Sequence, residues 1–417
     1  MEALNRPKNI LWIVIDTLRA DRLGCHGYFR ETSPTIDRLA SEGVLFENHT
    51  CSALSTGAAF SCLLSGLPAI SHRFYATPAA ATNIMSFDDA IPTVPEIIQS
   101  NTDYTTVAVD NLVNFAGHMK QTVRGFEFYI NVTRDGGFPQ PEYTAGEANE
   151  RFLTWLSTYG RENFFAFMHL WDPHHNPYRC PGYRDRFRQP AGSLEGLPVV
   201  RAESGYDYVP TWGRVGEIVW GIESEGLVRD VDGGTVSMEV REEGGGITQD
   251  LYDCSIAYVD SEIQRIIDQL DKLGILDVTA IVITADHGEG LGIHGVWGHG
   301  LPYQDTVHIP LVMWRPGLLP EGMRVKSYTQ HVDVAPTLLD LAGIGGGEEE
   351  IRSRVGTHLE VDVRMEGRSL LPLIRGTGEG REFVVTEVRR GPSDPGPYSP
   401  DDAVAQGIIL HFLDYSL

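Results

Sequence analysis

Two short apolar runs far apart in the sequence each end in an aspartate, and this feature constrains the fold most. The run Asn9–Ile15 leads into Asp16, and the run Thr279–Thr284 leads through one alanine into Asp286. Continuous apolar runs of this length are typical of parallel strands that are covered on both faces. Ligands of such sheets bind beyond the carboxyl ends of the strands. The sequence therefore predicts a parallel sheet with a site at the edge where the two aspartates stand.

The rest of the chain alternates between strand and helix patterns. Two more apolar runs, Thr105–Val109 and Phe164–Leu170, predict buried strands. Between the runs lie segments with helical periodicity: Ser33–Ser41, Thr93–Gln99, Gly146–Thr158 and Asp250–Leu273. This alternation is typical of the α/β class, in which helices cover both faces of a mostly parallel sheet.

Two stretches break the alternation and indicate the domain organisation. Residues 188–248 are rich in glycine and charge, with short alternating pieces such as Thr235–Val240, and predict an insertion with a hairpin or two. The run Gly343–Glu350 separates the last part of the chain. We therefore expect a large α/β domain over residues 1–345 and a small C-terminal α+β subdomain over residues 346–417, with a strand at Glu382–Val388.

The charge of the chain limits its partners. Its 57 acidic residues outnumber its 33 basic residues, and the formal net charge is −24. Long-range repulsion argues against nucleic acids and anionic membranes as partners. An anionic substrate would need a local positive centre. Because the chain contains very few lysines, a bound cation is the natural candidate for that centre.

The cysteines and the N-terminal region bear on the compartment. The five cysteines are scattered and show no C-x-x-C pairing, which predicts reduced, buried residues. No secretion signal precedes the apolar run that starts at Asn9, and that run is too short to span a bilayer, which predicts a cytoplasmic protein. The sequence carries no recognisable mark of an oligomeric state.

Four separate segments carry chemically useful side chains. The first two are the loop Asp16–Asp21 and the small-residue stretch Ser55–Gly66, which predicts a helix with the Thr56 hydroxyl at its N-terminus. Backbone N–H groups and the positive dipole end at such a terminus attract anions. The other two segments, His169–Tyr178 and Asp286–Gly300, are rich in histidine. Carboxylates, imidazoles and a hydroxyl together supply the ligands and the acid–base groups of a metal-dependent site.

These four segments, in this order, resemble the sulfatase family of the alkaline-phosphatase superfamily. Shorter stretches match the family as well: Thr32–Ala40, His308–Leu311, His331–Thr337 and Gly367–Leu370. The resemblance extends from Asn9 to about Gly376, apart from the insertion. It implies an alkaline-phosphatase-like sheet sandwiched by helices, a catalytic domain over residues 1–345 and metal-dependent hydrolysis of a small anionic ester.

The chain departs from the family at the nucleophile. Sulfatases carry a C-x-P-x-R motif whose cysteine is oxidised to formylglycine, whereas Thr56 and Phe60 stand at the cysteine and arginine positions here. A threonine cannot be oxidised to formylglycine, so the usual route of sulfate release should be closed. A threonine at a helix start is often only an N-cap. The other interpretation is that Thr56 is the nucleophile, activated by direct contact with a divalent cation.

The resemblance also implies a set of metal ligands: Asp16, Thr56, Asp286 and His287. Sulfatases usually have a second acid after the first aspartate and an asparagine after the late one, whereas this chain has Thr17 and His287. Exchanging carboxylate and amide for hydroxyl and imidazole favours one Zn²⁺ or Mn²⁺ ion over Ca²⁺ or Mg²⁺. A second metal, held with Asp172, remains an alternative.

This ligand set resembles that of the phosphodiesterases, phosphonate hydrolases and phosphoethanolamine transferases of the superfamily, several of which use threonine as nucleophile. We therefore expect hydrolysis of phosphate or phosphonate esters, or the related phosphotransfer, through Thr56. The candidate general acids for the leaving oxygen are His174, His175 and His299. His294, in the same loop as His299, is expected to bind substrate. Two alternatives are a sulfatase that uses threonine directly and a catalytically silent relative that binds an anion.

Overall fold

The structure is a computed structural model of the chain. It describes residues 6–74, 87–112, 119–132, 143–174, 180–183, 186–187, 200–201, 207–208, 227–229, 235–237, 249–291, 297–345, 365–388 and 407–411.

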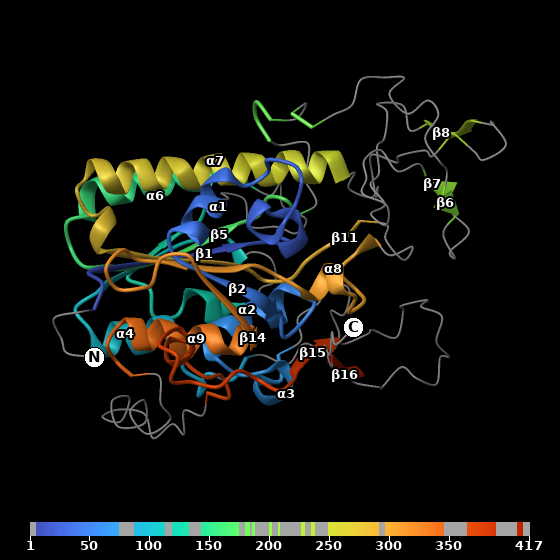
Figure 1. Cartoon of the computed structure of the whole chain (residues 1–417). Coiled ribbons are helices and arrows are strands. Elements are labelled where there is room, and N and C mark those ends of the chain that lie inside the picture. Colours follow the sequence, from blue (N-terminus) through green and yellow to red (C-terminus); the bar gives the residue numbers. More distant parts are fainter. Residues whose placement is uncertain are drawn as a thin grey trace.

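An eight-stranded sheet forms the centre of the described residues, in the strand order β14-β2-β13-β10-β1-β5-β3-β4 (Figure 1). Every neighbouring pair is parallel except those of β13, which runs antiparallel to both β10 and β2. The prediction of a mostly parallel sheet is therefore confirmed. In chain order the strands are β1 Asn9–Ile15, β2 Val44–Thr50, β3 Thr105–Val109, β4 Phe128–Ile130, β5 Phe164–Leu170, β10 Thr279–Ala285, β13 Leu311–Trp314 and β14 Met323–Gln330.

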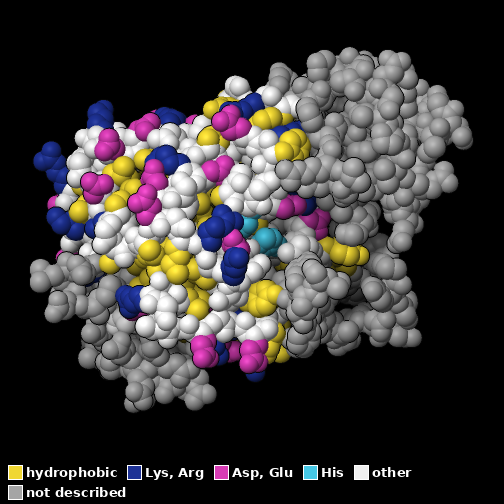
Figure 2. Space-filling model, viewed as in Figure 1, with side chains coloured by type: hydrophobic (Ala, Val, Ile, Leu, Met, Phe, Trp, Pro, Cys, Tyr) yellow, Lys and Arg dark blue, Asp and Glu magenta, His cyan; other side chains and the backbone are white. Residues whose placement is uncertain are grey.

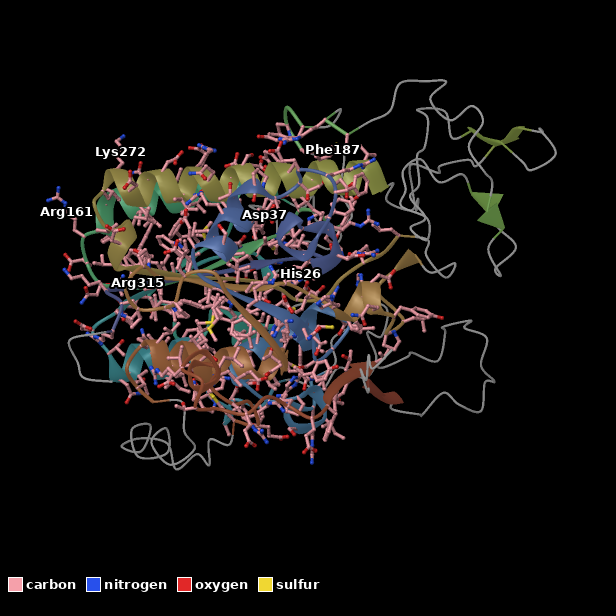
Figure 3. All side chains as sticks on the ribbon, in the orientation of Figure 1. His26, Asp37, Arg161, Phe187, Lys272 and Arg315 are labelled. Carbon is pink, nitrogen blue, oxygen red and sulfur yellow. The ribbon has the colours of Figure 1, made fainter. Side chains whose placement is uncertain are left out.

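Helices cover both faces of this sheet, as the alternating sequence pattern predicts. The helices α1 (Pro34–Ser41), α6 (Ala145–Tyr159) and α7 (Gln249–Lys272) lie together on one face (Figure 1). The helices α2 (Thr56–Ser65), α4 (Val94–Asn101) and α9 (His331–Leu341) lie on the other. Side chains fill the space between the layers, whereas Lys272 at the end of α7 projects outward (Figure 3).

The central strands are buried along their whole length. Their even-numbered and odd-numbered residues point to opposite faces of the sheet. Trp12 of β1 is the register partner of Phe167 on β5, and the two ring centroids are 4.9 Å apart. Phe60 of α2 packs against Phe167 with its ring edge-on, at 6.1 Å. Because successive side chains of a strand alternate between faces, the residues at even positions of β1 point toward α2. Asp16, two residues beyond the even position 14, is therefore aimed at the same layer.

Helix starts follow local sequence signals. The helix α6 begins with a capping box, in which Glu147 N donates to Thr144 Oγ1 at 3.3 Å and Thr144 N donates to Glu147 Oε2 at 2.7 Å. A second capping box joins Thr93 and Glu96 at the start of α4. These reciprocal bonds satisfy N–H groups that a helix end leaves unpaired.

The remaining described elements are short. The predicted insertion contains two pairs of antiparallel strands, and the strand predicted near Glu382 pairs with a later one. The bounds are α3 Ala69–His72, β6 Val200–Arg201, β7 Asp207–Tyr208, β8 Leu227–Arg229, β9 Thr235–Ser237, β11 Gly290–Leu291, β12 Trp297–Gly298, α8 Gln304–Val307, α11 Leu371–Ile374, β15 Val384–Val388 and β16 Gly407–His411. The division at residue 345 stays a prediction.

The surface that the structure describes carries charges of both signs. On the face in Figure 2, acidic and basic side chains are interspersed over the described residues. Among the helices that the structure describes, none combines the length and apolar character needed to span a bilayer. All five cysteines are free of disulfide bonds; the expectation that they are buried is confirmed for four of them and is wrong for Cys25, which is only partly buried.

Candidate metal centre and active site

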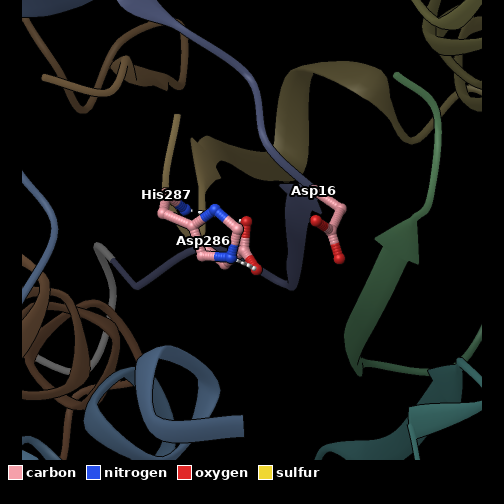
Figure 4. Close-up of side chains that lie close together, drawn as sticks. All are labelled: Asp16, Asp286 and His287. Atoms are coloured by element: carbon pink, nitrogen blue, oxygen red, sulfur yellow. Dashed lines mark hydrogen bonds and ion pairs between the residues drawn. The ribbon is translucent and has the colours of Figure 1, made fainter. Parts of the chain in front are cut away.

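Three buried side chains meet at the carboxyl ends of two adjacent strands. Asp16 follows β1, and Asp286 and His287 follow β10 (Figure 4). The strands stay in parallel register up to the pair Ile15 and Ala285, so the two aspartates leave the sheet at the same level. One ligand atom from each of the three residues lies within 4.8 Å of the others, and all three residues are fully buried. The sheet therefore gathers the predicted carboxylates and imidazole.

The chemistry of this group fits a divalent cation. Asp16 Oδ1 and Asp286 Oδ2 are buried and accept no hydrogen bond from the residues that the structure describes, although Asp286 Oδ2 lies 3.2 Å from His287 Nε2. Burial and the nearby Asp16 carboxylate raise the pKa of Asp286 well above its usual value. A buried charge needs a partner. A bound cation would supply that partner to both carboxylates at once.

The imidazole of His287 is oriented for the same purpose. Its Nδ1 lies 3.0 Å from the carbonyl oxygen of Gly288, which accepts a hydrogen bond when Nδ1 carries the proton. That tautomer leaves a lone pair on Nε2, the nitrogen that faces Asp286. A backbone carbonyl that fixes the tautomer of a histidine ligand is a common arrangement around metals.

The hydroxyl of Thr56 reaches this group from α2, in the helix layer toward which Asp16 points. It is the first residue of α2, is 4% exposed, and its Oγ1 lies 3.4 Å from His287 Nε2. Two ligand atoms about 2.1 Å from a tetrahedral ion are about 3.4 Å apart. The distance is therefore that expected for two ligands of one ion. The predicted placement of the hydroxyl at a helix N-terminus is confirmed.

The backbone beside Asp16 is strained and held in place. Thr17 has a φ of 55°, a left-handed conformation that a β-branched residue rarely adopts. Its N–H donates to Asp286 Oδ1 at 3.0 Å, and its carbonyl accepts from the Tyr252 hydroxyl at 2.7 Å. The same hydroxyl accepts from Arg19 N at 3.0 Å. Tyr252 of α7 thus fixes the loop that presents the first carboxylate.

Of the predicted histidines, His299 lies beside the metal group and His174 lies beside His299. The ring of His299 stacks on that of His287, with centroids 4.1 Å apart, and lies 5.6 Å from the ring of His174. His299 Nδ1 is 3.2 Å from Glu289 Oε2. Burial alone would lower the pKa of His299, but the hydrogen bond and charge of Glu289 raise it above the usual value. The other two predicted residues, His175 and His294, lie outside the described residues.

Asp172, considered above as a ligand of a second metal, instead holds the start of helix α6. Its Oδ2 accepts a hydrogen bond from Ala145 N at 2.7 Å, at the start of α6, and burial raises its pKa to about 7. Among the His, Cys, Asp and Glu side chains that the structure describes, only the group of Asp16, Asp286 and His287 has the spacing of metal ligands.

A buried histidine behind the metal group was not predicted. His169 Nε2 lies 3.2 Å from Asp16 Oδ2, and its Nδ1 lies 3.0 Å from Asp110 Oδ1. Burial alone would lower the pKa of His169, but the hydrogen bonds to Asp110 and Asp16 raise it to about 9. Phe60, at the family's arginine position, packs its ring against His169 at 4.7 Å. The sequence did contain a signal for part of this network: Asp110 directly follows the predicted strand Thr105–Val109, as Asp16 follows its own strand.

Gly288 allows the chain to pass close to a neighbouring loop directly after His287. Its N–H donates to Thr306 O at 2.8 Å, and an added Cβ would lie 2.1 Å from Asp305 O. We expect Gly288→Ala to lower the free energy of unfolding by about 1–3 kcal/mol and to weaken metal binding, because His287 must shift. Denaturant titration in the presence of a chelator would measure the change in unfolding free energy. Titration with the metal ion would measure the change in metal affinity. The control is Gly300→Ala, whose Cβ would meet no atom within 4 Å; equal effects in both variants would contradict the explanation.

Comparisons with known proteins cover most of the chain. The sequence model of the sulfatase family matches residues 8–344. The chain is 24% identical to the N-acetylglucosamine-6-O-sulfatase of Bacteroides thetaiotaomicron, over 91% of this chain and 72% of the relative. It is 26% identical to the multifunctional alkaline phosphatase superfamily protein PehA of Trinickia caryophylli, over 88% of this chain and 77% of the relative. The fold is similar to that of the phosphonate monoester hydrolase of Agrobacterium radiobacter, with a TM-score of 0.65 at 20% identity, over 94% of this chain and 82% of that one.

Proposed function

Because this chain belongs to the sulfatase family and is a sulfatase-like hydrolase, we propose that it cleaves phosphate or phosphonate esters with Thr56 as the nucleophile. The observation that carries the proposal is the 3.4 Å distance between Thr56 Oγ1 and His287 Nε2, beside two buried carboxylate oxygens that accept no hydrogen bond from the described part of the chain. The substrate is a small anionic ester. The net charge of −24 makes a local cation necessary for its approach.

Enzymes of this family depend on a metal, and the ligands proposed here are Asp16, Thr56, Asp286 and His287. The hydroxyl and imidazole favour Zn²⁺ or Mn²⁺ over the oxygen-preferring Ca²⁺ and Mg²⁺. When bound, the ion would lower the pKa of the threonine hydroxyl and neutralise charge on the ester.

In the proposed reaction, each of three side chains has a separate role. The Thr56 hydroxyl releases its proton to solvent, and its oxygen attacks phosphorus in line, which forms a phosphothreonine (or, from a phosphonate ester, the corresponding phosphonothreonine) as the bond to the leaving ester oxygen breaks. His299 donates a proton to the leaving oxygen, since the nearby Glu289 carboxylate orients its ring and raises its pKa. His174, whose ring centroid lies 5.6 Å from that of His299, contacts the substrate oxygens in this proposal. Water finally hydrolyses the phosphothreonine. Roles for His175 and His294 remain predictions from the sequence.

Sulfate esters are the second candidate substrates. The similarity to an N-acetylglucosamine-6-O-sulfatase favours them. Against them stand Thr56 and Phe60, which occupy the positions of the formylglycine precursor and of its arginine in sulfatases.

A panel of nitrophenyl esters would rank these functions. We expect the purified full chain to contain close to one equivalent of zinc or manganese and to hydrolyse phosphate diesters or phosphonate monoesters faster than sulfate esters. Removing the metal with a chelator should abolish the hydrolysis, and adding Zn²⁺ or Mn²⁺ should restore it. Faster turnover of the sulfate ester would establish the second candidate instead. A chain that binds metal but cleaves none of the esters would indicate the silent anion-binding alternative.

A further inference from the structure

A chain of buried hydrogen bonds extends from the metal group through the sheet. His169 of β5 is fully buried between Asp16 and Asp110, and each of its ring nitrogens lies within 3.2 Å of a carboxylate oxygen. Asp110 is held in turn, because its Oδ1 accepts from Leu112 N and its Oδ2 accepts from the Tyr129 hydroxyl. The ring of His169 is therefore fixed at both ends.

The two oxygens of Asp16 have different surroundings. Oδ2 lies 3.2 Å from His169 Nε2, whereas Oδ1 accepts no hydrogen bond within the described residues. A carboxylate that is free to rotate about its Cβ–Cγ bond could exchange the two. An N–H donor on one oxygen keeps the other aimed into the metal group, and such outer hydrogen bonds are known to govern metal affinity.

We propose that His169 is a positioning residue, which selects the oxygen of Asp16 that binds the metal ion. The proposal rests on the metal site proposed above. Phe60 and Trp171 pack against the His169 ring, with centroids at 4.7 Å and 4.8 Å, and fix the direction of its N–H groups. Thus Phe60, which replaces the arginine of sulfatases, supports the site through packing against His169.

A pair of substitutions separates this positioning from packing. The side-chain nitrogen of glutamine can reach the place of a histidine Nε2, whereas that of asparagine reaches only the place of Nδ1. His169→Gln therefore keeps a donor for Asp16, and His169→Asn keeps a donor for Asp110 alone. Both changes replace the ring by a smaller amide, so we expect similar losses of unfolding stability.

The experiment is an equilibrium titration of the full chain with Zn²⁺ or Mn²⁺ without substrate, with the unfolding stability measured in chelator. For His169→Asn we expect the metal Kd to rise about 10- to 100-fold, and for His169→Gln by only about threefold. Unchanged Kd values in both folded variants, or equal increases in both, would overturn the positioning role. A wild-type chain that binds neither ion would instead refute the metal site on which the proposal rests.

A milder variant covers the case in which neither His169 variant folds. Asp110→Asn keeps the shape of the side chain and an acceptor oxygen for His169 Nδ1, but it removes the charge that strengthens this hydrogen bond. We expect its metal Kd to rise severalfold, about 3- to 10-fold. An unchanged Kd in this variant would also overturn the proposal, because the ring would then need no support from Asp110.

Discussion

Replacing Thr56 by alanine is expected to lower the rate of ester hydrolysis by about 10³-fold or more. The reason is that the proposed mechanism takes both the attacking oxygen and one metal ligand from this hydroxyl. The free energy of unfolding should change by less than about 1 kcal/mol, because alanine is a good helix former at the first position of α2. Steady-state kinetics with the best ester of the panel, together with denaturant titration, would measure the two effects.

Neighbouring and conservative substitutions provide the controls for Thr56. Ser55 precedes α2 as its N-cap residue, yet its side chain makes no capping hydrogen bond, so Ser55→Ala should retain most of the activity. Thr56→Ser keeps the nucleophilic oxygen and should retain measurable turnover. Full activity in Thr56→Ala would show that Thr56 is only part of the helix start, and the nucleophile would have to be sought elsewhere.

Replacing Asp286 by asparagine is expected to have opposite effects on metal binding and on stability. An amide oxygen can still accept from Thr17 N and His287 N, which now donate to Asp286 Oδ1 at 3.0 Å and 2.7 Å. The substitution removes a carboxylate whose pKa is raised by burial and by Asp16, so the charged form opposes folding at neutral pH. We expect the metal-free variant to gain about 1–3 kcal/mol of unfolding free energy and to lose stoichiometric metal binding and hydrolysis.

A buried aspartate with basic partners provides the matched control. Asp253 is also fully buried, but its Oδ2 accepts from Arg30 Nη1 and from the Tyr28 hydroxyl, both at 2.6 Å. Asp253→Asn should therefore lower the free energy of unfolding, since it weakens a buried ion pair. Denaturant titrations of both variants in chelator would test the difference. A loss of stability in metal-free Asp286→Asn would contradict the view that the metal group is crowded with negative charge.

The sequence was sufficient to locate the two carboxylates. Asp16 and Asp286 stand at the ends of apolar runs whose length and flanks indicate buried strands, and parallel pairing must bring such ends to one edge. The side chains that surround these two carboxylates depend on the order of the strands in the sheet, which a single sequence does not reveal. The strand order places β5 beside β1, and only this adjacency brings His169 to Asp16. Within its apolar run, a lone histidine looks like a core residue.

Other elements were missed for different physical reasons. The strand β13 has only four residues, and β14 at the sheet edge alternates between buried and exposed side chains, so neither resembles the long apolar runs of the centre. Tyr252 lies in the first turn of an amphipathic pattern that predicts α7 well, but its hydroxyl donates to the carbonyl of Thr17, far away in the sequence. The left-handed conformation of Thr17 was equally hidden, since glycine is the usual residue there.

The seven register pairs that join β1 to β10 place the two aspartates at one fixed separation, whatever side chains follow them. A mutation at position 287 can therefore exchange one proposed donor atom for another while the register of the two strands persists. Such a framework allows an ancestral enzyme to change its preferred ion, and with it the ester it hydrolyses, through few substitutions. Its descendants can diversify in chemistry long before their architecture diverges.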